Sequence, residues 1–205
     1  MVKSILLAAL LSLTFVTLST AQVPLNTGYN HAFYTPYPIA PLLSNIPDNY
    51  WINIASYPTT TPPVAPSWVL LRPTAWSLAL PLTNWIGARP TVASGAGTTS
   101  NNPGYTIFRK CFCLLPNFTQ PTLSFKIRAD DTVQVWFNSQ LNVALPPSPG
   151  NFNSTVLTSA PSSPTWFHAG INCIYVLVED FGGYAGFDLA LKQAKVLRPQ
   201  QRVTL

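Results

Sequence analysis

An alternation of apolar and polar residues runs from Tyr105 to Leu191, and it constrains the fold more than any other feature of the chain. It is clearest where Leu123, Phe125 and Ile127 alternate with polar or charged neighbours. Successive side chains of a strand point to opposite faces, so a period of two predicts strands with one buried face. The strands predicted in this stretch are residues 105–116, 123–128, 133–137, 174–179 and 187–192.

The remaining chain adds two predicted strands, at residues 48–54 and 68–71, and two long loops, at residues 87–104 and 138–165. No helical periodicity of useful length interrupts this pattern. Many short strands separated by proline and glycine are typical of two sheets that bury their inner faces against each other. We therefore expect an all-β fold, an antiparallel two-sheet β-sandwich of jelly-roll type. A closed barrel is the alternative, and it suits such long and uneven loops less well.

The first residues have the pattern of a targeting signal. Lys3 gives a basic start, residues 5–16 are mostly apolar, and Ser19 and Ala21 are the small residues that precede a cleavage site. The apolar run is too short to span a bilayer, which needs about 20 residues. We expect residues 1–21 to be a signal peptide and the mature chain to be secreted, extracellular and without a membrane span. The predicted divisions that follow are a Pro/aromatic-rich arm at 22–47, a β-sandwich domain at 48–193 and a C-terminal tail at 194–205.

The composition argues against a nucleic-acid partner. Charged residues make up 8% of the chain and hydrophobic residues 47%, a balance that favours a rigid β protein over a disordered one. The net charge is +5, but it arises because acids are few, and lysine and arginine are scattered without long runs. A nucleic-acid binder would instead concentrate basic residues in a patch or stripe.

Three cysteines, Cys111, Cys113 and Cys173, predict one disulfide in an oxidising compartment. Cys111 and Cys113 lie two positions apart on the same face of one predicted strand, and Cys173 opens another. We expect Cys173 to pair with Cys111 or with Cys113. The remaining thiol is either buried and inert or available for disulfide-linked self-association, and non-covalent self-association is a further candidate.

The order of several landmarks resembles the galactose-binding-domain-like jelly roll, a module of secreted lectin-like proteins and of the sugar-binding domain in glycoside hydrolase family 2. The resemblance covers roughly residues 48–192 and implies a jelly-roll fold with a sugar-binding role. Its landmarks are Asp48 to Trp51, Trp85-Ile86, the strand from Phe108-Arg109 to Leu115-Pro116, the hairpin from Ala129 to Asn138, and Gly170-Ile-Asn172.

One landmark departs from the family pattern, and one is shared with a second family. The hairpin carries Asn138-Ser139 in place of Asn-Gly, the pair that a two-residue turn favours, so a longer turn is predicted. A PA14-type sandwich also places two aspartates before an alternating strand, where they bind calcium near a glycan. The Gly170-Ile-Asn172 feature favours the galactose-binding-like family.

Aromatic rings beside loops are the natural platforms for sugars, because the apolar face of a pyranose stacks on a ring. Trp85 and Tyr184 are the rings expected to be exposed, whereas Trp51, Trp68 and Trp136 are expected in the core. Hydrogen-bonding partners complete the predicted carbohydrate site, which consists of Trp85, Arg89, Asn138, Asp180 and Tyr184. The alternative is that these rings seal one end of the sandwich.

Asp130 and Asp131 are candidate calcium ligands, since calcium takes hard oxygen ligands that backbone carbonyls can complete. No cofactor other than calcium is expected. In the alternative reading, one aspartate accepts backbone N–H groups in the turn while the other is solvated or pairs with Arg128. Two sequons, at Asn117 and Asn153, are candidate N-glycosylation sites of a secreted chain.

Catalysis is disfavoured. The chain has only six carboxylates, no Gly-x-Ser-x-Gly elbow and no obvious pair to flank a glycosidic bond. The sequence therefore predicts a secreted, non-catalytic, lectin-like protein that binds extracellular or cell-surface glycans or matrix components. The alternative is a structural extracellular-matrix or secreted-coat protein without a small-molecule ligand.

Overall fold

A computed structural model describes residues 25–30, 35–36, 46–57, 64–81, 83–88, 98–100, 104–114, 116, 118–154, 156–181 and 183–197. The predicted signal peptide and most of the predicted N-terminal arm lie outside these residues, as does the end of the predicted tail. Within the described ranges, no helix has the length and apolar character needed to cross a membrane.

Strands make up most of the described residues. The strands are β1 (Tyr29–Asn30), β2 (Thr35–Pro36), β3 (Pro47–Tyr57), β4 (Ala65–Val69), β5 (Ile86–Gly87), β6 (Thr98–Ser100), β7 (Gly104–Leu114), β8 (Thr119–Asp130), β9 (Thr132–Phe137), β10 (Val143–Pro149), β11 (Leu157–Thr158), β12 (Gly170–Asp180) and β13 (Gly183–Leu197). A 3₁₀ turn, η1 (Pro164–Trp166), precedes β12.

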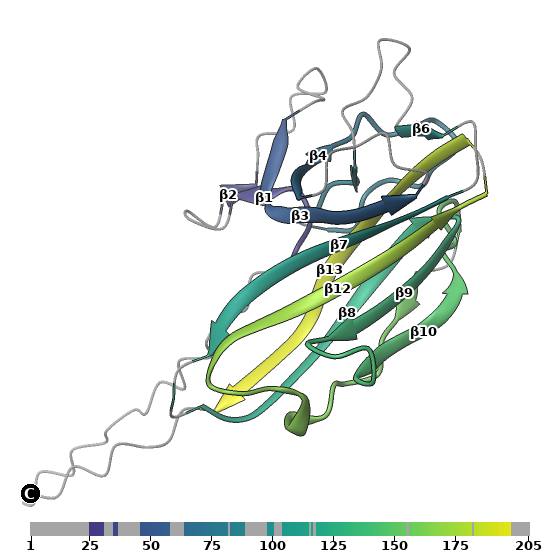
Figure 1. Cartoon of the computed structure of the whole chain (residues 1–205). Coiled ribbons are helices and arrows are strands. Elements are labelled where there is room, and N and C mark those ends of the chain that lie inside the picture. Colours follow the sequence, from purple (N-terminus) through teal and green to yellow (C-terminus); the bar gives the residue numbers. More distant parts are fainter. Residues whose placement is uncertain are drawn as a thin grey trace, which may run out of the picture.

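One curled antiparallel sheet contains all of these strands except β1 and β2, which pair with each other. Its order is β10-β9-β12-β7-β3-β4-β5-β13-β8-β11, and β6 joins it by pairing with β13. In Figure 1 the front limb (β10, β9, β12, β7 and β3) lies before the back limb (β13 and β8). The all-β antiparallel expectation is confirmed, and the strands form a single curled sheet.

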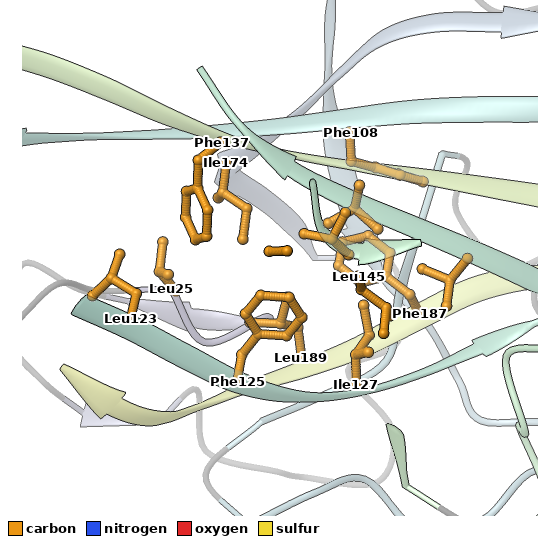
Figure 2. Packing of buried hydrophobic residues seen from close by; sticks show 14 of the residues in the cluster. Leu25, Phe108, Leu123, Phe125, Ile127, Phe137, Leu145, Ile174, Phe187 and Leu189 are labelled. Carbon is orange, nitrogen blue, oxygen red and sulfur yellow. The ribbon is translucent and has the colours of Figure 1, made fainter. Parts of the chain in front are cut away.

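The core fills the space between the two limbs (Figure 2). Phe108 of β7 contacts Phe187 of β13 with ring centroids 4.9 Å apart, and Phe125 of β8 contacts Phe137 of β9 at 6.5 Å. Trp51, expected in the core, is 0% exposed and meets Phe187 edge to face. Because alternate residues of each long strand point inward, the period of two in the sequence becomes this core.

The five strands predicted between Tyr105 and Leu191 are all present, as β7, β8, β9, β12 and β13. β13 continues to Leu197, beyond the predicted end of the domain at residue 193. The two long loops predicted at residues 87–104 and 138–165 contain further strands, β6 in the first and β10 and β11 in the second.

Strand β10 was missed because it contains three prolines. Proline cannot donate to a sheet ladder, but an edge strand needs only one hydrogen-bonded side. β10 is the end strand of the sheet order and pairs only with β9. The turn between them spans residues 138–142, and Asn138 adopts a positive φ of 55°. The departure from Asn-Gly thus accompanies a longer turn, as predicted.

The N-terminal segment at residues 25–30 belongs to the fold. Leu25 is 0% exposed and lies in the core, and the Thr27 amide donates to the Leu189 carbonyl at 3.1 Å. Asp48, from the Asp-x-x-Trp landmark, accepts hydrogen bonds from the amides of Gly28, Tyr50 and Trp51. The landmark therefore holds this segment against β3.

Cys111 and Cys173 form the disulfide, which selects one of the two predicted pairings. They lie directly opposite each other on β7 and β12, with Cα atoms 4.1 Å apart. Cys113, two residues further along β7, is free and exposed. It is therefore not the buried, inert thiol of one earlier expectation.

Candidate functional site

The structure divides the five residues predicted to bind carbohydrate. Trp85 and Tyr184 both lie against Trp76, at ring-centroid distances of 4.3 Å and 6.3 Å. Trp76 donates from Nε1 to Asp130. The nearby charge of Asp180 contributes to raising the pKa of Asp130, so Asp180 lies close to this pair. Three of the five thus gather at one end of the sheet. Arg89 lies outside the described residues.

Asn138 lies at the opposite end. Its amide donates to the carbonyl of Cys173, seven positions before Asp180 on β12, which corresponds to roughly 23 Å along a strand. Its side chain accepts from the Cys173 amide at 2.8 Å and donates to the Trp166 carbonyl at 2.7 Å. Asn138 therefore anchors the β9–β10 turn, and it does not share a site with Asp180.

The expected exposure of Trp85 is wrong. Trp85 is 1% exposed because it packs with Trp76 and Leu70 in a small second core, and its Nε1 donates to the Ser77 carbonyl at 3.1 Å. Tyr184 packs against this cluster and is half-buried. These rings seal the end of the sheet, as the alternative interpretation held, and Trp85 offers no ring face to a sugar.

Four of the six carboxylates meet at this end, which we call the acidic end: Asp130, Asp131, Glu179 and Asp180. Asp130 and Asp131 join β8 to β9 through a cis peptide bond, and Glu179 and Asp180 close β12. The Asp131 amide donates to the Glu179 carbonyl at 2.9 Å, which ties the two pairs together. This concentration of acids stands out in a chain of net charge +5.

The two neighbouring aspartates have different surroundings. Asp130 is 6% exposed, and its Oδ2 accepts from Trp76 Nε1 at 2.7 Å. Burial raises the pKa of Asp130 to about 7, and a hydrogen bond with the Asp131 side chain acts in the same direction. Neither aspartate is held by Arg128, which donates to the Leu78 carbonyl. Asp130 is therefore partly protonated near neutral pH.

Asp131 takes the turn-capping role that one interpretation predicted. Its Oδ2 accepts from the amide of Phe181 at 2.6 Å, which holds the start of the β12–β13 turn. Phe181 itself is 65% exposed. Sequence reasoning missed this ring, although its place between Glu179-Asp180 and two glycines is the available signal. An exposed aromatic ring thus stands beside the carboxylates.

A metal site receives no direct geometric support. No group of three or more His, Cys, Asp or Glu side chains in the described ranges has an arrangement that could hold a metal ion. Calcium at Asp130 and Asp131 therefore remains a prediction that backbone carbonyls would have to complete. Of the two sequons, Asn153 is exposed in the turn after β10, and Asn117 lies outside the described residues.

Searches with this sequence find no matching protein-family model and no matching curated protein.

Proposed function

We propose that this chain is a secreted, non-catalytic protein that binds carbohydrate of extracellular or cell-surface glycans at its acidic end. In this proposal the curled sheet is a two-sheet jelly roll of the galactose-binding-domain-like type. The observation that carries it is the pairing of exposed Phe181 with Asp131, beside further carboxylates. A pyranose offers an apolar face for the ring and hydroxyls for the acids.

Each residue has a distinct part in this proposal. Phe181 supplies the stacking surface, while Asp131, which is half-buried, accepts hydrogen bonds from sugar hydroxyls. Trp76 and Asp130 lie beneath them and fix the loop from which Asp131 projects. Trp85 and Tyr184 belong to the packed layer behind this loop, so their part is to support the site. Calcium would add a positive charge among the carboxylates and orient a pair of hydroxyls.

A glycan array probed with the secreted chain tests the proposal. We expect binding to a defined set of glycans, reduced at least roughly tenfold in Phe181→Ala, because stacking on a ring contributes on the order of 1 kcal/mol or more. Leu141→Ala is the matched control, since Leu141 is a 90% exposed apolar residue on the β9–β10 turn at the other end. The array is run with calcium and with a chelator.

Two results would overturn the carbohydrate proposal. One is the absence of binding to every glycan under both conditions, and the other is binding that Phe181→Ala leaves unchanged. Loss of binding in the chelator alone would assign a role to calcium. Asp131→Asn would then be expected to remove the calcium dependence.

A structural role in an extracellular matrix or secreted coat is the second candidate. The exposed, free thiol of Cys113 favours it, because such a thiol can join two chains in an oxidising compartment. Disulfide-linked dimers on a non-reducing gel that vanish in Cys113→Ser, together with an empty glycan array, would favour this function over the first.

A further inference from the structure

The outward side of the front limb carries large side chains in three consecutive cross-strand pairs. Glu179 lies opposite Tyr105, Leu177 opposite Ile107, and Tyr175 opposite Arg109. The neighbours of these residues on β12, Val176 and Val178, point into the core, so the six share the outer side. We call these six residues the outer face. Figure 1 shows this side of β7 and β12 toward the viewer, with no other described strand over it.

The outer face is mostly apolar or aromatic, yet it carries one base and one acid. Arg109 and Glu179 are both half-buried. Within the described part of the chain, the Arg109 guanidinium has no hydrogen-bond or ion-pair partner. The two residues are four positions apart along the strands, roughly 13 Å, so they do not meet within one chain. They lie on either side of the Ile107–Leu177 pair.

This arrangement is complementary to itself. A two-fold axis through the Ile107–Leu177 pair would exchange the positions of Arg109 and Glu179 between two facing copies. Each Arg109 would then meet the Glu179 of the other copy, and the aliphatic pair would contact its own equivalent at the centre. Such isologous interfaces, in which one patch meets itself, are the commonest way for proteins to form dimers. Charge complementarity thus selects a second copy of this chain as the occupant.

The edges of the sheet are poor alternatives for self-association. β10 is one edge and carries Pro146, Pro147 and Pro149, which supply no donors, and β11 at the other edge has only two residues. The outer side of the front limb offers a broader contact. Its three long strands, β3, β7 and β12, have 11 residues each and span roughly 36 Å by 14 Å, or about 500 Å². This area is below the value of about 800 Å² per partner in a standard interface, so we expect a weak dimer that dissociates on dilution.

We propose that the chain forms a symmetric, non-covalent homodimer through the outer face, with Arg109 of each copy paired to Glu179 of the other. Glu179 is the one acidic-end residue in the interface, whereas Phe181 and Asp131, which the carbohydrate proposal uses, take no part in it. The dimer therefore does not depend on carbohydrate binding. It also does not depend on Cys113, which lies four residues beyond Arg109 on β7 and away from the axis.

Sedimentation of the secreted chain over a range of concentrations tests the dimer. We expect a dimer in the wild type, and a roughly hundredfold or greater weakening in Arg109→Glu and in Glu179→Arg, since each variant places like charges together twice. Mixing the two variants is the sharp test. Arg109→Glu presents two acids and Glu179→Arg two bases, so the mixture should form a heterodimer although neither variant dimerises alone.

Controls separate the interface from folding and from disulfide exchange. Lys126→Glu reverses an exposed charge on β8, outside the outer face, and should leave the dimer intact. Circular dichroism confirms that each variant is folded, and a reducing agent should not dissociate the dimer. The double variant Arg109→Glu/Glu179→Arg should dimerise, because it restores both charge pairs. It keeps the test valid if one single variant folds poorly. A wild-type chain that stays monomeric, or a dimer that survives Arg109→Glu and Glu179→Arg, overturns the proposal.

Discussion

Lys110 is a buried base inside the front limb. It is 2% exposed, its Nζ donates to the Asn26 carbonyl at 3.3 Å, and it lies 5.6 Å from the ring centroids of Tyr50 and Trp51. Burial lowers the pKa of Lys110 to about 7, and the charge of Asp48 opposes this shift. Burial raises the pKa of Asp48, while the charge of Lys110 and the three amides bonded to Asp48 act in the opposite direction.

The lowered pKa has a consequence for stability. Between pH 7 and pH 10.5 the unfolded chain holds the Lys110 proton while the folded chain releases it. The free energy of unfolding should therefore rise with pH across this window, by roughly a few kcal/mol in full. Lys110→Met should lack this rise, because position 110 then carries no titrating group.

Urea unfolding at pH 7 and pH 9.5 measures this difference. Lys126→Met, which removes an exposed lysine of β8, is the control and should keep the wild-type slope. An equal slope in Lys110→Met and the wild type would show that Lys110 is not the group that titrates.

At the scale of elements, the connection between β8 and β9 depends on a glycine after β10. The Gly150 amide donates to the Asp131 carbonyl at 2.6 Å, and its carbonyl accepts from the Ala129 amide at 2.9 Å. A Cβ at position 150 would lie 2.1 Å from the Ala129 carbonyl oxygen. A side chain here would push β10 away from the loop that carries Asp130 and Asp131.

Gly150→Ala should therefore destabilise the fold by about 1–3 kcal/mol and weaken any binding at the acidic end. Ser154→Ala, an exposed change in the following turn, should stay within about 0.5 kcal/mol of the wild type. Thermal unfolding of both variants gives the comparison. Unchanged stability in Gly150→Ala would mean that this contact relaxes without cost.

The elements also show how far the sequence can predict the fold. Strands such as β8 and β12 were predictable because one face is buried, and burial imposes the alternation that the sequence displays. β10 was not, because its prolines suit an edge position that only tertiary pairing defines. The exposure of Trp85 was wrongly predicted for a similar reason, because its burial depends on Trp76, nine residues earlier, and on Leu70. Phe181 was missed because exposure of a single ring leaves no periodic signal.

At the scale of the whole molecule, a segment close to the N-terminus completes the core. Leu25 lies near Leu123 and Phe125 in Figure 2 and is 0% exposed. Leu25→Ala should lower the free energy of unfolding by about 2–5 kcal/mol, as for other fully buried leucines. Leu141→Ala, at an exposed position, is the control, and urea unfolding is the measurement. A small loss in Leu25→Ala would show that this segment contributes little to the core.

The Cys111–Cys173 bridge closes a loop of sequence separation 62, and this loop contains β8, β9 and β10. The exposed β9–β10 turn, with Leu141 at its tip, lies inside the loop and is an accessible place for a protease to cut. A cut there releases no fragment, because both new ends stay on pieces that the bridge joins. Wherever a protease reaches this turn, the bridge would keep a nicked chain whole.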